Sequence, residues 1–348
     1  MDRFEPAIAI TGTAVISAAG IGSKPALAAL TSGTSCLKPI PDDLVAGTTG
    51  HYWGRADQFK ATDFIPPLKA RKFDRASQFA VAAVGMALAD AGLVKGAFPS
   101  DRIGIALGSG FGGIANASEL LSGYYQAGVP GLSPVLFPNT VANAAASNAS
   151  IEYGLQGPNI TFIQRFCSAE SAILAACRFI EEGRADIMLA GGVDELTPQM
   201  IRGFAVTGQL TRFASGFGEG CGILVLERAE HARARGAAIT AQLTAINTVG
   251  FLLPGSEQQG INHLLQEQKR CDQLFFSGPE LALKPLLGAV SAGSTHYPSR
   301  VIGSSLAMGG TVLGLLTASL QPGEQGLQLA ASPEGPYYAI SVIGGDPA

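Results

Sequence analysis

The chain has 348 residues, of which 47% are hydrophobic and 14% charged, with a formal net charge of −4. This balance excludes a disordered chain and a coiled coil, and it offers no basic surface for a nucleic acid. No apolar run reaches the roughly 18 residues of a membrane-spanning helix. Residues 1–5 lack the order of a signal peptide, and five widely spaced cysteines favour reduced thiols over disulfides or a metal site. We therefore expect a cytoplasmic protein without a metal.

Short β-like runs alternate with alanine-rich helical runs, which predicts an α/β fold. In the first hundred residues we expect a strand over 7–12, a helix over 73–93 capped by Asp74, and a strand over 102–108. The glycines of 108–113 resemble a phosphate loop only weakly, because no Lys-Ser/Thr follows them. Their preferred interpretation is that they let backbone segments pass closely.

The most informative part of the sequence lies between residues 157 and 192. It predicts a strand over 159–165, a sharp turn, a helix of small residues over 168–182 and a strand over 186–190. Such a turn holds one residue at the positive end of a helix, where an anion or a thiolate is favoured.

A second half begins near Ile239, so we divide the chain into a first domain, 1–238, and a shorter second domain, 239–348. The elements expected there are strands over 241–249, 274–276, 301–303 and 338–343, and a helix over 314–320. The low charge and abundance of small residues predict broad buried contacts, and hence an oligomer.

Several of these segments resemble the β-ketoacyl-acyl-carrier-protein synthases, the ketosynthases of fatty-acid and polyketide assembly. The segments that carry the resemblance are 10–12, 27–35, 102–113, 153–158, 183–192 and 218–227. The resemblance implies the thiolase fold, an α/β fold of two similar βαβαβαββ halves in five layers, and an obligate dimer.

In that family a cysteine at a helix N-terminus carries the growing acyl chain as a thioester. Counting forward from Pro158 and back from Gly183 places Phe166 at the cysteine position of the family pattern. Cys167 follows one residue later and remains a possible reactive thiol.

The family also uses two histidines and a lysine to decarboxylate the malonyl unit and stabilise oxyanions. The first histidine position is held by Ser277, and the second by Thr311 or its neighbour Val312. The lysine position falls on Leu306 or Ala307. No catalytic residue is therefore expected among these positions. The phenylalanine of the family's C-terminal gating loop is replaced by Ile343.

This profile resembles the chain-length factors of type II polyketide systems and the degenerate partners of aryl-polyene and polyene pathways. The resemblance implies a heterodimer with an active ketosynthase, and an acyl carrier protein whose phosphopantetheine arm reaches the complex, with no tightly bound cofactor. Residues implied to lie along the acyl tunnel or the interface are Ala117, Asn143, Ala144, Asn159, Thr161, Ile163, Phe166 and Ile343.

Two alternatives remain open. In the first, the chain is an unusual acyltransferase or condensing enzyme that uses Cys167. In the second, it is a stand-alone homodimeric scaffold or acyl-binding protein. A basic cluster of Lys69, Arg71, Lys72 and Arg75 is either a solvated face or a contact for the acyl carrier protein.

Overall fold

The computed structural model describes residues 3–94, 96, 98–266, 268–333 and 335–345. Among these residues, eleven strands form one large sheet, and three short strands form a second sheet beside it. The strands of the large sheet are β1 (Arg3–Ser17), β2 (Gly20–Ile21), β5 (Ile103–Gly108), β6 (Asn159–Phe162), β7 (Ile187–Asp194), β9 (Gly220–Arg228), β10 (Ala241–Val249), β11 (Arg270–Ser277), β12 (Ser291–His296), β13 (Gln325–Ala331) and β14 (Tyr337–Gly344). The small sheet contains β3 (Lys38–Pro39), β4 (Tyr52–Gly54) and β8 (Phe217–Gly218).

The large sheet consists of two halves with the same strand order. The first half runs β6-β5-β7-β9-β1 and the second runs β12-β11-β13-β14-β10. In each half the first three strands are parallel and the next two pairings are antiparallel. The halves meet where β1 pairs antiparallel with β10. This repeat confirms the two similar halves that the resemblance implies, while the domain boundary at 238/239 stays a prediction.

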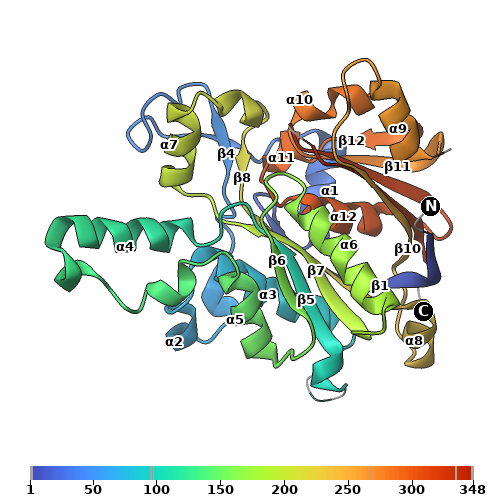
Figure 1. Cartoon of the computed structure of the whole chain (residues 1–348), viewed down its shortest axis with the longest axis horizontal. Helices are drawn as coiled ribbons and strands as arrows, with labels where there is room; N and C mark the ends of the chain where they lie inside the picture. Colours follow the sequence, from blue (N-terminus) through green and yellow to red (C-terminus); the bar gives the residue numbers. More distant parts are fainter. Residues whose placement is uncertain (1–2, 95, 97, 267, 334, 346–348) are drawn as a thin grey trace.

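Helices cover the outer faces of the sheet and also lie between its two halves (Figure 1). The longer helices are α1 (Ser23–Ser32), α3 (Arg75–Asp90), α4 (Ile114–Ala127), α5 (Ala144–Tyr153), α6 (Ser168–Glu181), α7 (Pro198–Val206), α9 (Glu257–Leu265) and α12 (Gly309–Ser319). The shorter α-helices are α2 (Pro67–Ala70), α8 (Ala229–Ala234), α10 (Glu280–Leu283) and α11 (Ser299–Ile302). The 3-10 helices are η1 (Ala61–Asp63), η2 (Ser100–Arg102), η3 (Val129–Gly131), η4 (Phe137–Asn139), η5 (Leu210–Phe213) and η6 (Lys284–Leu286).

The central layer is formed by α6 and α12, which contact each other and strands of the sheet. Because α12 contacts β1, β7 and β9 of the first half and β11 and β13 of the second, it lies between the two halves. Helices α3 and α5 cover the outer face of the first half, and α9 and α10 cover the second. The result is five layers, the thiolase-like α/β arrangement.

Glycine allows the central helices to approach the strands closely. A Cβ atom on Gly108 of β5 would overlap the backbone of Ser168, in the first turn of α6. A Cβ atom on Gly222 of β9 would overlap the backbone at the start of α12. The sequence interpretation of 108–113 as a close-packing segment is therefore confirmed.

Several predicted elements match the structure closely. Asp74 caps α3 by accepting a hydrogen bond from the Ser77 amide, and β10 has the predicted bounds. The prediction of a strand over 301–303 is wrong, because these residues belong to α11 and its C-terminal end. Val301 and Ile302 are buried in this short helix, which follows Pro298. The prediction failed because an apolar run this short does not distinguish a strand from a helix.

Candidate functional site

A cavity of about 340 Å³ lies beside the start of α6. Its lining comes from the glycine loop, α4, α7, η5 and the segment before α12. The apolar lining residues are Phe111, Ile114, Phe166, Met200, Phe204 and Leu306, and the polar ones are Arg165, Gln199, Thr207, Gln209 and Arg212. The side chains of Phe166, Met200 and Leu306 are buried, whereas Arg165, Gln199 and Thr207 are exposed. The cavity thus has an apolar floor and a polar rim.

Phe166 forms part of this floor and is 1% exposed. Its ring lies 5.5 Å from that of Phe213, which stacks on Phe217 at 4.3 Å. Trp53 belongs to the same hydrophobic cluster. A large aromatic side chain therefore fills the turn between β6 and α6, at the position that the sequence resemblance predicts for a nucleophile.

Cys167 points into a different part of the molecule. Its backbone has a positive φ of 74°, and its side chain joins the hydrophobic core between the two halves of the sheet. The Sγ atom lies 3.6 Å from the carbonyl oxygen of Pro336. Burial, together with the nearby Glu170, raises the pKa of this thiol well above its ordinary value. The thiolate is therefore disfavoured, and the cavity lining contains Phe166 rather than Cys167.

Ser277 ends β11 inside a buried polar cluster. Its hydroxyl donates a 2.7 Å hydrogen bond to Oε1 of Glu170, and Nε2 of Gln328 donates a 2.9 Å bond to the same oxygen. Burial raises the pKa of Glu170, and the bonds from Ser277 and Gln328 oppose that shift. A Cβ atom on Gly309 would overlap this carboxyl group. The cluster thus joins the first turns of α6 and α12 to the end of β11 and the middle of β13.

Sequence reasoning missed Glu170 and Gln328. Glu170 is a single acidic residue within the run of small residues that begins α6. Because an isolated charge on a buried helical face needs polar partners, this residue could have predicted a buried polar cluster. Gln328 gave no comparable signal, because the strand that contains it was not predicted.

Thr311 lies in the first turn of α12 and is buried, as are Leu306, Ala307 and Val312. The nearest histidine in the sequence is His296, at the end of β12, where its Nε2 atom lies 3.2 Å from Gln273 Oε1. Burial lowers the pKa of His296. His296 is the last residue of strand β12.

The predicted tunnel and interface residues are spread over several elements. Ala117 is half-buried on α4, one turn after the cavity-lining Ile114, and Ala144 is buried at the start of α5. Asn143 is exposed immediately before α5.

The remaining predicted residues lie on strands or just beyond them. Asn159 and Thr161 belong to the edge strand β6, and Ile163 follows it with 53% exposure. Ile343 lies within β14, paired with Gln242 and Gln325, and not in a loop. Of all the predicted tunnel and interface residues, only Phe166 is among the described residues of the cavity lining.

Comparison with known protein families identifies the chain. The sequence model described as "Beta-ketoacyl synthase, N-terminal domain" matches residues 5–232. The chain belongs to the β-ketoacyl synthase family. Its similar relatives include the 3-oxoacyl-[acyl-carrier-protein] synthases 2 of Vibrio cholerae, 34% identical over 269 residues, and Vibrio harveyi, 32% identical over 265 residues. Each alignment covers 71% of this chain but only 63% of the relative, so the chain matches less than two thirds of these synthases.

Solved structures of β-ketoacyl synthases share the fold over almost the whole chain. A β-ketoacyl synthase from Burkholderia phymatum has a TM-score of 0.81 at 20% identity, covering 99% of this chain and 100% of that one. The ishigamide ketosynthase/chain length factor has a TM-score of 0.80 at 19% identity, covering 98% and 100%. A type II polyketide ketosynthase in complex with its acyl-carrier protein and bound to the hexaketide gives 0.79 at 20% identity, covering 97% and 99%.

Proposed function

We propose that this chain is a non-catalytic, chain-length-factor-like partner of an active ketosynthase in fatty-acid or polyketide-type chain elongation. The observation that carries the proposal is the orientation of two neighbouring residues. The ring of Phe166 lines the cavity, whereas the thiol of Cys167 enters the central core. A buried thiol with a raised pKa does not favour thioester formation.

The acid–base groups that condensation needs are also replaced. The hydroxyl of Ser277 is bound to Glu170, and residues 304–312 contain neither histidine nor lysine. Buried aliphatic side chains occupy this segment instead, including Leu306 and Ala307. These replacements remove the histidines and the lysine that the family chemistry uses to stabilise oxyanions and transfer protons.

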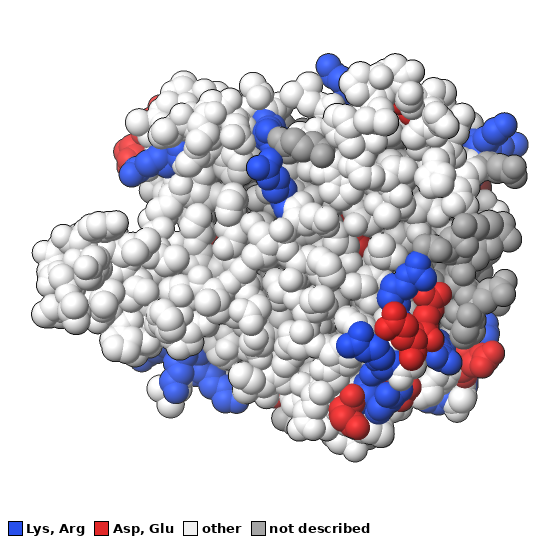
Figure 2. Space-filling view, in the orientation of Figure 1, with Lys and Arg blue, Asp and Glu red and all other residues white. Residues whose placement is uncertain are grey.

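An apolar arm supports the partner role. Residues 114–141 contain a single charged residue, Glu119. Helix α4 of this arm projects away from the body, and the arm shows no charged side chain in Figure 2. Its exposed large hydrophobic residues are Leu121, Tyr124, Tyr125, Val129, Leu132, Val135, Phe137 and Val141. An exposed apolar surface of this kind is typical of a protein–protein interface.

The edge of the large sheet adds to this surface. Strand β6 ends the sheet in the first half and pairs only with β5 among the described strands. Ile163 is exposed immediately after it. An uncovered strand edge and an exposed apolar arm in the same half of the molecule favour association, and we expect an obligate interface of more than roughly 2,000 Å². We assign Asn159, Thr161 and Ile163 to that interface.

An acyl carrier protein is the proposed source of the substrate. Its phosphopantetheine arm would deliver the acyl chain to the complex, with no tightly bound cofactor in this chain. The short helix α2 carries Lys69, and Arg71 and Lys72 follow it. Lys69 is paired with Glu152 at 2.9 Å, and all three basic residues are exposed. This charge suits an acidic protein surface. No described helix is both long and apolar enough to cross a bilayer.

The decisive experiment is co-expression with a ketosynthase that retains its cysteine and both histidines. The complex is expected to copurify and to condense acyl and malonyl groups held on acyl carrier protein. Replacing the partner's nucleophilic cysteine should abolish condensation, whereas Cys167→Ala should leave it unchanged. Condensation by this chain alone that disappears in Cys167→Ala would establish the acyltransferase alternative. A tight homodimer that ignores every ketosynthase would establish the scaffold alternative.

A further inference from the structure

The apolar arm, residues 114–141, keeps almost all of its side chains outside the core. Of these residues, all of which the structure describes, only Asn139 is buried, and helix α4 contains no buried residue. A helix of 14 residues without a buried face is only marginally stable by itself in water. The arm therefore depends on contacts at its two roots, residues 112–115 and 139–142, where the chain leaves the body and returns to it.

The two roots of the arm lie against each other. A Cβ atom on Gly112 would overlap the Cα atom of Ala142, and one on Gly113 would overlap the carbonyl oxygen of Asn139. Beyond the roots, α4 contacts η3 and η4 of the returning segment. The arm therefore leaves and re-enters the body through one narrow base, and its two limbs pack on each other where it projects from the body (Figure 1).

Glu195 holds the outgoing root. This buried residue directly follows β7, and its Oε1 atom accepts a 2.9 Å hydrogen bond from the amide of Ala115 in the first turn of α4. Amides in the first turn of a helix have no partner within the helix. The N-cap residue of α4 is Gly113, which has no side chain to serve as an acceptor. Glu195 supplies that acceptor from a distant part of the sequence, and it thereby fixes the point at which α4 starts.

Asn139 holds the returning root. Its Nδ2 atom donates a 2.6 Å hydrogen bond to the carbonyl oxygen of Lys72, and its Oδ1 atom accepts a 2.9 Å bond from Nδ2 of Asn148 on α5. Asn148 Nδ2 also donates a 2.9 Å bond to the hydroxyl of Ser77 on α3. Because the side-chain amide of Asn139 is buried, breaking these bonds would leave costly unpaired polar atoms. The position of the returning root is therefore well defined.

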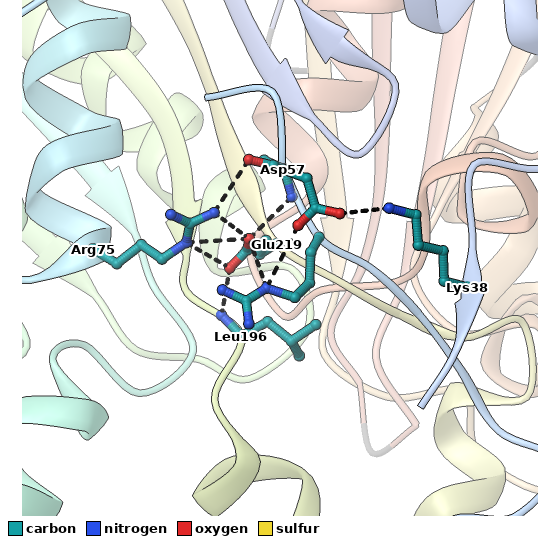
Figure 3. A network of polar contacts seen from close by, with 7 residues as sticks. Lys38, Asp57, Arg75, Leu196 and Glu219 are labelled. Carbon is teal, nitrogen blue, oxygen red and sulfur yellow. Dashed lines mark hydrogen bonds and ion pairs between the residues drawn. The ribbon is translucent and has the colours of Figure 1, made fainter. Parts of the chain in front are cut away.

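Both roots are attached to the same part of the body, the start of helix α3. The backbone amide of Leu196, the residue after Glu195, donates a 3.1 Å bond to Oε2 of Glu219. The side chain of Glu219 is fully covered and also accepts a 2.6 Å bond from Arg75, the first residue of α3 (Figure 3). The carbonyl group that receives the bond from the returning root lies three residues before α3 starts. The arm is thus held at both ends against one helix of the body.

We propose that Glu195 and Asn139 are positioning residues that hold the apolar arm in one direction in the free chain, so that it meets its partner as a preformed surface. This inference rests on the partner role proposed above for the arm. Both residues are buried, so they lie outside the exposed apolar surface itself. An element that is ordered before binding loses less conformational entropy on association. Loss of either side chain should therefore weaken association, although every exposed apolar residue is retained.

Hydrogen exchange on the full chain tests the positioning role without a partner. Glu195→Ala and Asn139→Ala should each lower the protection of the α4 amides by about tenfold or more, relative to amides in the centre of β14. Glu195→Gln keeps an oxygen that can accept the bond from Ala115, so it should retain the protection of the unmodified chain. Unchanged protection in both alanine variants would overturn the proposal. A loss in Glu195→Gln as large as that in Glu195→Ala would also contradict it, because the contact with Ala115 would then not be the cause.

Glu227→Ala is the matched control for a general loss of stability. Glu227 is also a buried glutamate, but it accepts hydrogen bonds from Thr11 and Arg235 beside α8, far from α4 in Figure 1. Its replacement should lower the free energy of unfolding and leave the relative protection of α4 unchanged. An equal loss of α4 protection in this variant would mean that the arm reports only global stability, and the proposal would fail.

Association with the co-expressed ketosynthase tests the consequence for recognition. Analytical ultracentrifugation should show about tenfold or more weaker binding for Glu195→Ala and Asn139→Ala, whereas Glu195→Gln and Glu227→Ala should bind like the unmodified chain. Equal affinities in all four variants would refute the link between the direction of the arm and recognition. If the unmodified chain binds no ketosynthase, the proposed function fails, and the exchange experiment on the chain alone still decides whether these residues position the arm.

Discussion

The hydroxyl of Ser277 and the carboxyl group of Glu170 are 2.7 Å apart, although 107 residues separate them in the sequence. This bond connects the end of β11 to the first turn of α6. Because both groups are buried, each depends on the other to satisfy its polar atoms. The contact explains how a helix of small residues tolerates an acidic side chain at its core-facing end.

Removing the carboxyl group of Glu170 should destabilise the fold. Glu170→Ala leaves Ser277 and Gln328 unpaired, and we expect a loss of about 2–4 kcal/mol in the free energy of unfolding. Glu170→Gln keeps a polar group of the same size and should cost much less. Urea denaturation at pH 6 measures both variants, and equal losses would show that the hydrogen bonds contribute little.

The same residue should influence how stability depends on pH. The pKa of Glu170 is raised in the folded protein, so its stabilising contribution is complete below the unfolded-state pKa. That contribution decreases as pH rises through the folded-state pKa, where the buried carboxyl group ionises. Glu170→Gln should therefore lose less stability than the unmodified chain as pH rises. Parallel stability–pH curves would argue against a buried neutral acid.

Thiol labelling should distinguish the cysteines. Burial raises the pKa of both thiols, but Cys36 is only half-buried, whereas Cys167 is buried and the pKa of its thiol is raised well above the ordinary value. Iodoacetamide at pH 8 should modify Cys36 first and leave Cys167 unmodified until the chain unfolds. Mass spectrometry after incubation with acyl-carrier-bound substrate should likewise find no acyl group on Cys167. A stable acyl adduct there would restore the acyltransferase alternative.

Charge introduced into the apolar arm should break the proposed complex. Tyr125 is 81% exposed on α4, and Tyr125→Glu would bury a charge in the interface. We expect at least a hundredfold weaker association, because an unpaired buried charge is costly. Val94→Glu is the matched control, since Val94 is also exposed but lies outside the arm and β6. Analytical ultracentrifugation with the ketosynthase partner compares the two variants.

A bulky residue at Ala117 should shorten the products of the complex. Ala117 lies one turn beyond Ile114 on the same side of α4, and its small side chain leaves room for an acyl chain in the proposed tunnel. Ala117→Phe should stop elongation earlier without preventing the first condensation. Gln126→Phe places the same ring in the last turn of α4 and should leave product length unchanged. If Ala117→Phe leaves it unchanged too, the tunnel does not pass this residue.

Local patterns were sufficient for the central part of the fold. Strand, turn, small-residue helix and strand between 159 and 190 follow from alternation, helical spacing and terminal glycines, although β6 ends earlier and β7 runs further than predicted. Strands β12 and β13 escaped prediction, because β12 consists mainly of small and polar residues such as Ser294, and β13 is short and carries a glutamine, Gln328, at a buried position.

The site was predictable only in part. Counting from Pro158 and Gly183 identified Phe166 as the residue in the turn, and the structure adds that its ring lines a cavity. The cavity itself could not be predicted, because its lining comes from segments spread over two hundred residues. Asp194, for example, accepts hydrogen bonds from the backbone amides of Gly110 and Ala307, and no side-chain pattern reveals an amide donor.

The repeated strand order leaves the sheet with two different edges. One edge, β6, lies in the half that bears the apolar arm, whereas the other, β12, is a mostly exposed strand of serine, threonine and glycine. Of these two edges of the described sheet, we expect β6 to bind the neighbouring subunit. We therefore expect association to stop once that edge is occupied, giving a closed pair of defined size instead of a growing filament.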